Sequence, residues 1–387
     1  MDYGKRIAHE VRKTFNLRAR FARFRDIRKN PRIPLRTILL SLFLMPFFGH
    51  RSLLGLDRAC RSSEYKRLLG SKRSMVASDS TFARVLRWLD GEQVVQFQRS
   101  FLQDFQSADL LRRRLVDGAP LRRLGIIDGS CMGGHWISSL CLSGKINYPV
   151  IVRPYRSRGD ELGTASEILD EVHSTLGTAA PELYLLDALY FTRPIFTQVK
   201  ALKAHLLIKL KDAEYREVTK DAQNLFDHFG GDREQEGFDS SRWCHWSMQQ
   251  TIGQFAGQTV QVVHLHEYYP KRTVNKTLDC WIVTTDLSLT LPEIREAAHL
   301  RWQIENNLFK RLNHLSGTKR FYFKDQRRFI NLLCLLAAAV ALLDALIYSL
   351  ARKPQLDKVL RDGIKPTWLN LFSRMQELLF IHHTVLY

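Results

Sequence analysis

Three acidic residues of this chain have the type and placement that metal-dependent phosphodiester chemistry requires. Asp128 and Asp187 each end an apolar, strand-like run, and Glu305 lies in a helical stretch. Mg²⁺ is a hard ion that prefers oxygen ligands, and two such ions about 3.5–4 Å apart activate a water and stabilise the leaving oxygen in phosphodiester cleavage. We therefore expect Asp128, Asp187 and Glu305 to be both metal ligands and catalytic residues.

Each acid also has a purely structural interpretation. Asp-Gly is a common turn dipeptide, so Asp128 before Gly129 also fits a turn, and Asp187 has the same two interpretations. Arg301 and Glu305 are four residues apart on one helical face, where the arginine could orient the carboxylate or contact a phosphate. The alternative is an ordinary surface ion pair, worth about 0.3–0.5 kcal/mol.

The elements that must position these acids follow a definite order. Hydrophobic periodicity predicts, in turn, a strand over 123–128, strands over 135–142 and 148–155, a helix around 165–172, a strand ending at 187, a helix over 194–203 and a strand over 205–211. A three-stranded meander followed by helix, strand, helix and strand is the order of a ribonuclease-H-like core. The predicted fold class is α/β (α+β), with a mixed-sheet catalytic core.

We expect five segments along the chain. They are a helical, basic DNA-binding domain (1–115), the first part of the core (116–211), a β-rich insertion (212–280), the second part of the core (281–350) and a C-terminal helical segment (351–387). Polar turns and short runs of β-branched residues distinguish the insertion. After it come a strand over 281–285 and the helix that carries Glu305.

The charge of the chain favours a polyanionic partner. Its 387 residues carry a formal net charge of +19, which indicates nucleic acid first and an anionic membrane surface second. Residues 1–36 hold twelve Lys or Arg against three acids, with phenylalanines between them. This segment is either a solvated amphipathic helix or an arm that contacts phosphates.

A second basic segment, 78–89, begins with capping residues and continues as an amphipathic helix. As a recognition helix it would direct Arg84 and Arg87 to DNA, and as a packing helix it would support the core. The sequence does not separate the two.

Cysteine usage and hydropathy indicate a cytoplasmic protein. The six cysteines form no Cys-x-x-Cys pair, so neither a zinc ribbon nor a disulfide framework is expected. The first apolar run begins only near Ile38, so no secretory signal is expected. Residues 329–350 are apolar enough to suggest a membrane span, but Asp344 interrupts them and a buried core helix is the better interpretation. We expect no membrane partner.

Four ordered motifs resemble the DDE transposases of bacterial insertion sequences. They are Ile126-Ile127-Asp128-Gly129-Ser130, then Leu185 to Phe191, then Trp281 to Thr285, then Arg301 to Lys310. The resemblance implies a ribonuclease-H-like domain with a β insertion before the glutamate, and cut-and-paste transposition with two Mg²⁺ ions, for which Mn²⁺ can substitute. It also implies double-stranded DNA, both transposon ends and target, as the partner of a homodimer.

The glutamate helix keeps this family's signature only in part. Tyrosine, arginine, glutamate and lysine recur there at fixed spacing, and Arg301 and Glu305 fit, but Ala298 and Leu312 occupy the tyrosine and lysine positions. The candidates to replace the missing groups are His299, Lys310 and Arg311. Lys209 and Lys211 are further candidate phosphate contacts, although isolated lysines are more often solvated surface.

Two other functions fit the same motifs. One is a DNA-binding protein derived from a transposase but without catalysis. The other is a stand-alone metal-dependent nuclease that cuts DNA without joining it.

Overall fold

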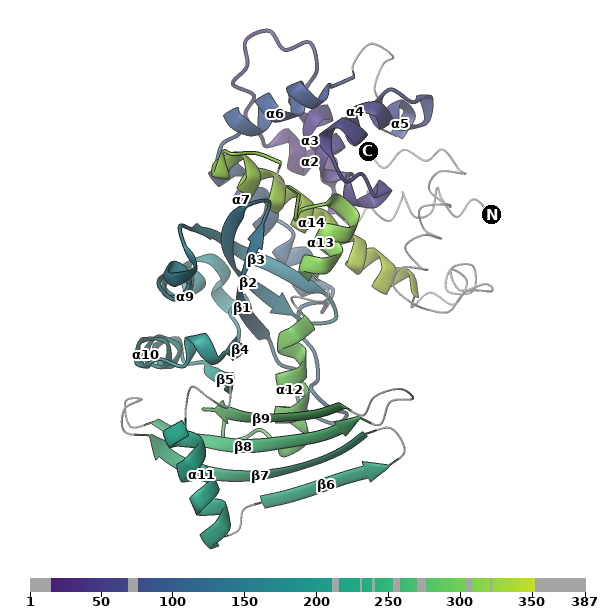
Figure 1. The fold of residues 1–387 in the computed structure, drawn as a ribbon. Coiled ribbons are helices and arrows are strands. Elements are labelled where there is room, and N and C mark those ends of the chain that lie inside the picture. The colour runs from purple at the N-terminus through teal and green to yellow at the C-terminus, as the bar shows by residue number, and fades with distance from the viewer. Residues whose placement is uncertain are drawn as a thin grey trace.

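The structure is a computed structural model that describes residues 15–68, 76–210, 216–229, 232–238, 241–252, 258–269, 276–303, 308–320 and 322–351. Its strands are β1 (Leu124–Met132), β2 (His135–Ser143), β3 (Asn147–Tyr155), β4 (Leu183–Asp187), β5 (His205–Leu210), β6 (Asp232–Phe238), β7 (Ser241–Ile252), β8 (Gln258–Tyr269) and β9 (Lys276–Thr284). They form one nine-stranded sheet in the order β3-β2-β1-β4-β5-β9-β8-β7-β6. In Figure 1, β1 to β5 lie between a helical region at one end of the molecule and β6 to β9 at the other.

The first three strands form the predicted meander. β1 pairs antiparallel with β2, and β2 pairs antiparallel with β3. Between β1 and β2, Gly133 and Gly134 have φ values of 56° and 82°. Positive φ at both positions of a two-residue loop is typical of the tight turns that match strand twist.

Two helical crossovers make the centre of the sheet parallel. β1 pairs with β4 and β4 pairs with β5 in parallel register. The crossover helices are α9 (Glu161–Leu176) and α10 (Arg193–Ala201), with short 3₁₀ turns η2 (Arg158–Asp160), η3 (Gly177–Ala179) and η4 (Ala188–Tyr190) beside them. α9 contacts β2 and β3, α10 contacts β5, and α12 (Leu291–Gln303) contacts β4 and β5. In Figure 1, α9 and α10 lie on one side of these strands and α12 on the other. The mixed α/β fold predicted from the sequence is confirmed.

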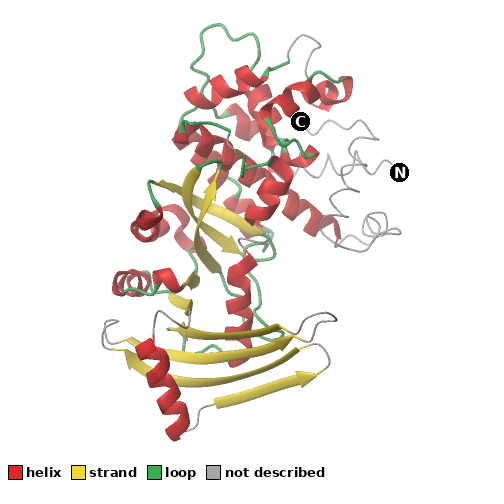
Figure 2. Ribbon diagram, in the orientation of Figure 1, coloured by secondary structure: helices red, strands yellow, loops and turns green. Residues whose placement is uncertain are grey.

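The strands of 232–284 extend the sheet from β5. β9 pairs antiparallel with β5, and β8, β7 and β6 follow, each antiparallel to its neighbour. The segment also contains a helix that the sequence reading missed, α11 (Arg216–Phe229), which packs against β7. Its buried residues Val218, Ala222 and Phe226 recur every four positions, which is a helical spacing. Figure 2 shows this helix beside the four long strands.

The described residues between 15 and 107 are mainly helical, as predicted. Its helices are α2 (Leu17–Ala22), α3 (Leu35–Phe43), η1 (Pro46–Phe48), α4 (Leu53–Cys60), α5 (Ser63–Leu68), α6 (Asp79–Trp88), α7 (Gly91–Arg99) and α8 (Leu102–Ser107). An aromatic cluster holds them together, with the rings of Phe21 and Phe97 stacked at 4.8 Å between centroids. Arg20 pairs with Asp104 and lies 4.3 Å from the ring centroid of Phe101. From Phe15 onward, the aromatic face of the basic segment is therefore buried in the helical region.

One long helix joins this region to the sheet. α14 (Gln326–Ala351) contacts α3, α6, α7 and β3, and it follows α13 (Lys310–Ser316). Residues 326–348 are long and apolar enough to cross a membrane, but 94% of the 18-residue window is buried inside the protein. Asp344, which interrupts the apolar run, is 8% exposed and pairs with Arg311 at 2.7 Å. The helix is thus a core helix, as the sequence indicated.

Candidate active site and basic groove

Asp128 and Asp187 lie near the same end of the parallel ladder between β1 and β4. The ladder between β1 and β4 pairs Leu124 with Leu183 and Ile126 with Leu185. Asp128 and Asp187 each follow the last pair of this ladder by two residues, and both carboxylates raise the pKa of Tyr190. The two carboxylates therefore lie in one neighbourhood, around Tyr190. Asp128 is 4% exposed, and Asp187 is half-buried.

The strand that carries Asp128 does not end there. The sequence predicted a strand end at Asp128, but β1 continues to Met132 because β2 pairs with it along its whole length, with Asp128 opposite Ser139. The parallel ladder to β4, however, has Ile126 and Leu185 as its last pair. The two aspartates therefore lie just beyond the point where β1 and β4 stop pairing.

Backbone amides hold both aspartates. Gly129 N donates to Asp128 Oδ1 at 3.1 Å, and Leu189 N donates to Asp187 Oδ1 at 2.8 Å. The second bond belongs to η4, the 3₁₀ turn that follows Asp187. Each carboxylate is thus oriented by the backbone that comes directly after it.

A fourth acid, which the sequence analysis did not identify, lies beside this pair. Glu161, the first residue of α9, accepts hydrogen bonds from Tyr155 Oη at 3.1 Å and from Tyr190 Oη at 2.8 Å. Its carboxylate lies directly over Gly129, where an added Cβ would be 2.4 Å from Glu161 Cδ. Tyr190 is part of the motif around Asp187, so its position near the site was the one available signal in the sequence.

Both tyrosines remain hydrogen-bond donors throughout the physiological pH range. Burial raises the pKa of Tyr155 and of Tyr190 well above the ordinary value, and the adjacent Glu161 carboxylate raises both further. Asp128 adds to the rise at both tyrosines and Asp187 adds to it at Tyr190. The two hydroxyls, Glu161 and the two aspartates thus form one electrostatically connected group.

The third predicted acid, Glu305, lies outside the described residues, and so does Lys211. The helix that leads to Glu305, α12, is described up to Gln303. Among the described residues, no group of three or more His, Cys, Asp or Glu side chains could hold a metal ion. The described part of the site therefore provides two of the three expected carboxylates.

The predicted cations occupy different environments. Lys209 lies opposite Asp187 in the register of β4 and β5 and is half-buried, and its pKa is lowered chiefly by burial and further by Arg301. Arg301 is thus close enough to lower the pKa of Lys209, on the strand next to Asp187. Lys310 is exposed in the first turn of α13, whereas Arg311 pairs with Asp344 of α14.

The positions that correspond to the missing tyrosine and lysine are apolar and buried. Ala298 is 4% exposed and Leu312 is 1% exposed. His299, one candidate replacement, contacts Glu267 at 3.0 Å, and Arg295 donates to the same carboxylate at 2.6 Å. Glu267 is fully buried, so His299 belongs to a buried ionic cluster between α12 and β8.

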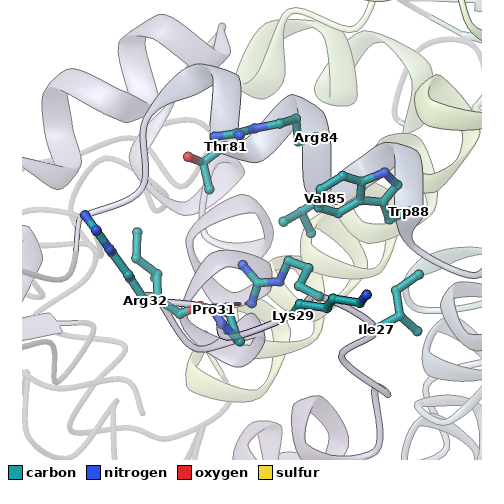
Figure 3. Close-up of a pocket in the computed structure, with 10 residues that line it drawn as sticks. Ile27, Lys29, Pro31, Arg32, Thr81, Arg84, Val85 and Trp88 are labelled. Carbon is teal, nitrogen blue, oxygen red and sulfur yellow. Dashed lines mark hydrogen bonds between the residues drawn. The ribbon is translucent and has the colours of Figure 1, made fainter.

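A groove of about 650 Å³ lies between α6 and the segment 27–33. Figure 3 shows Thr81, Arg84, Val85 and Trp88 of α6 across from Ile27, Lys29, Pro31 and Arg32. All ten lining residues are neutral or basic. Arg84 lines the groove, and Arg87 is exposed on the same helix outside it.

The groove has an unbalanced positive charge and an accessible aromatic ring. Within the described part of the chain, no hydrogen bond or ion pair holds the side chains of Lys29, Arg32 or Arg84, while Arg28 is paired with Asp26 at 2.6 Å. Trp88 is 46% exposed. α6 itself is anchored, because Asn331 of α14 donates to the carbonyl oxygens of Leu86 and Leu89 at 3.2 and 3.1 Å. The cations are therefore presented by a fixed helix.

Comparison with protein families identifies one match. Residues 155–342 match the family model described as the transposase DDE domain. The matched segment begins at the last residue of β3 and ends within α14, so it includes Asp187 and Glu305 and begins downstream of Asp128. No curated protein sequence matches the chain.

Proposed function

We propose that the protein is a DNA transposase that cleaves DNA at the ends of an insertion sequence and transfers the freed strand, by cut-and-paste transposition. Residues 155–342 match the family model described as the transposase DDE domain. The observation that carries this proposal is that Asp128 and Asp187 both follow the end of the parallel ladder between β1 and β4 by two residues and both act on Tyr190. Two carboxylates so placed have the donor chemistry that phosphodiester cleavage with divalent cations requires. The matched family supports a transposase function in general, and the specific reaction is our proposal.

Asp128, Asp187 and Glu305 are the residues that would hold the metal. Their carboxylates are hard oxygen donors, which suits two Mg²⁺ ions or Mn²⁺ in their place. Bound there, the ions supply an activated water and neutralise charge on the attacking and leaving oxygens. The backbone bonds from Gly129 and Leu189 would keep two of the three carboxylates oriented.

Nearby cations would position the DNA backbone. Lys209, which pairs with Asp187 across β4 and β5, and Arg301, which acts on Lys209, would contact phosphates next to the carboxylates. Lys211, Lys310 and Arg311 would be further contacts. The groove beside α6 supplies a second contact, remote in sequence, in which Lys29, Arg32 and Arg84 would bind phosphates. Arg87 would extend this contact along α6.

The wider assignments follow from the same function. We propose the same division of the chain as above. It comprises a helical DNA-binding domain (1–115), two core parts (116–211 and 281–350), an insertion (212–280) and a C-terminal segment (351–387). We further propose that a homodimer on double-stranded DNA pairs the two ends. We also propose a cytoplasmic location, because the DNA substrate of a bacterial insertion sequence lies there.

The decisive experiment is a cleavage and strand-transfer assay on DNA that carries the sequences flanking this gene. We expect the native protein with Mg²⁺ to give both nicked and joined products, and Asp128→Asn, Asp187→Asn and Glu305→Gln to give neither while they still bind DNA. Unchanged cutting by the three variants would overturn the proposed site. Nicked products without joined ones would instead indicate a stand-alone nuclease, and binding without cutting by the native protein would indicate an inactive DNA-binding protein.

A further inference from the structure

The Glu161 carboxylate connects the end of β3 to the turn that follows β4. Glu161 begins α9, Tyr155 is the last residue of β3, and Tyr190 lies in the turn after β4. One carboxylate oxygen accepts from Tyr155 Oη at 3.1 Å, and the other accepts from Tyr190 Oη at 2.8 Å. Because Tyr155 is 5% exposed and Tyr190 is fully buried, neither hydroxyl can exchange this partner for bulk water without repacking.

The same carboxylate also rests on β1. A Cβ at Gly129 would be 2.4 Å from Glu161 Cδ, 2.4 Å from Oε1 and 2.7 Å from Oε2. Any side chain at position 129 would therefore displace this carboxylate from the place where the two tyrosines hold it. Gly129 N in turn donates to Asp128 Oδ1 at 3.1 Å.

Glu161 thereby reaches both aspartates through the residues that follow them in the chain. On the β1 side, the intermediate is Gly129, whose amide orients Asp128. On the β4 side, it is Tyr190, which belongs to the same turn as Leu189, the amide donor to Asp187. A change at Glu161 would therefore alter the relative position of two carboxylates that are not paired by any strand ladder.

We propose that Glu161 is a positioning residue, which fixes the separation and orientation of the Asp128 and Asp187 carboxylates through Gly129 and Tyr190. This inference rests on the proposed function. Groups that orient metal-binding side chains typically matter by about 10–100-fold in metal affinity or activity. The supporting contacts are geometric, so the effect depends on the shape and hydrogen bonding of residue 161 more than on its charge.

The test compares variants of the full chain by two measurements. One is Mn²⁺ binding by calorimetry in the absence of DNA, and the other is the cleavage rate on end-containing DNA at saturating metal. We expect Glu161→Ala, and the double variant Tyr155→Phe with Tyr190→Phe, to weaken Mn²⁺ binding by about 10–100-fold. We expect Glu161→Gln to stay within a few-fold of the native protein, since its side-chain amide keeps the size, accepts from one tyrosine and donates to the other.

Two matched controls separate positioning from general damage. Glu171 lies on the same helix and pairs with Arg153, and Tyr184 is a buried tyrosine of β4 outside the site. Glu171→Ala and Tyr184→Phe should leave Mn²⁺ binding unchanged. The paired tyrosine variant also keeps the test decisive where Glu161→Ala lowers the yield of folded protein.

A double-variant comparison tests the contact with Gly129 directly. Gly129→Ala alone should weaken Mn²⁺ binding because the new methyl group collides with the carboxylate. In a Glu161→Ala background, the same change should add little, because the collision partner is gone. If the two changes instead reduced the affinity for Mn²⁺ by independent factors that multiply, the proposed contact would be overturned.

The remaining outcomes distinguish failure of this inference from failure of the proposed function. A Glu161→Gln defect as large as that of Glu161→Ala would show that the charge acts directly and would overturn positioning. Native Mn²⁺ binding in Glu161→Ala and in the paired tyrosine variant, together with its loss in Asp128→Asn, would overturn this inference alone. Native Mn²⁺ binding and cutting in Asp128→Asn would instead overturn the proposed function.

Discussion

Arg311 donates to Asp344 at 2.7 Å and so joins α13 to the long buried helix α14. Asp344 is 8% exposed within an otherwise apolar helix, so its charge is stabilised by this cation. Removal of one partner of a buried pair typically costs about 3–5 kcal/mol. We predict that Arg311→Ala lowers the free energy of unfolding by an amount in this range, measured by urea denaturation.

The double variant distinguishes the pair from other contacts of Arg311. Arg311→Met combined with Asp344→Leu removes both charges and should recover most of the stability lost by Arg311→Ala. If Arg311 instead acts mainly on DNA, the single variant keeps native stability and loses DNA affinity. Lys310→Ala, one residue away and exposed, is the control for stability.

A second ion pair predicts a dependence of stability on pH. Asp286 follows β9, is 2% exposed, and pairs at 2.6 Å with Arg122, which precedes β1. Burial alone would raise the pKa of Asp286, but the hydroxyl of Ser288 and the Arg122 guanidinium outweigh it and hold the pKa below its usual value. A lowered folded-state pKa contributes stability that is complete above the unfolded value of about 3.9 and disappears as the pH falls through the folded value.

We therefore predict that Asp286→Asn lowers the free energy of unfolding at pH 7 and reduces its acid dependence below about pH 4. Denaturant titrations from pH 7 down to pH 2.5 measure both effects. Asp227→Asn, at an exposed acid of α11, should leave the acid dependence intact. An Asp286→Asn curve parallel to that of the native protein at every pH would contradict the assignment.

The basic groove predicts how DNA binding depends on salt. Each phosphate contact contributes a slope of about −0.9 to the plot of log affinity against log salt concentration for duplex DNA. We predict that Lys29→Ala, Arg32→Ala and Arg84→Ala each weaken binding and reduce the magnitude of the slope by about 1. Fluorescence anisotropy with a labelled duplex at several salt concentrations measures both quantities.

Two further variants test whether the groove itself makes the phosphate contacts. Lys200→Ala, at an exposed lysine of α10 away from the groove, should leave the slope unchanged. Arg87→Ala probes the same helix outside the groove, and an effect equal to that of Arg84→Ala would assign the contact to α6 as a whole. Native slopes in all three groove variants would exclude the groove as a phosphate site.

Local sequence patterns predicted the elements better than their contacts. The meander, the helix α9 and the position of Asp187 at a strand end follow from hydrophobic spacing within each segment. The strand end at Asp128 was wrong because Asp-Gly resembles a turn, whereas the turn lies at Gly133 and Gly134. The local sequence favours a turn at Asp128-Gly129, but the pairing of β1 with β2 continues through it and leaves the turn at Gly133-Gly134.

The role of Glu161 could not be predicted from local pattern. It is an ordinary acid at a helix start, where the helix dipole alone explains its type. Its partners Gly129 and Tyr190 are 32 and 29 positions away, and only the parallel crossover brings them together. Similarly, the phenylalanines of the basic N-terminal segment could not be assigned to the core until their partners, such as Phe97, were placed.

Because Asp128 and Asp187 lie close together, we expect their substitution to change thermal stability in opposite directions without and with metal. Two carboxylates on neighbouring strands repel each other when no cation lies between them. Asp128→Asn and Asp187→Asn should therefore raise the melting temperature of the metal-free protein. Added Mg²⁺ or Mn²⁺ should stabilise the native protein, by about 2.7 kcal/mol at a hundred times the dissociation constant, and should stabilise these variants much less. Glu305→Gln should show the same reduced response if that residue completes the site, whereas Asp227→Asn should respond as the native protein does. Differential scanning calorimetry with EDTA and with added metal measures both signs, and a native-sized metal response in Asp128→Asn or Asp187→Asn would show that the ion binds elsewhere.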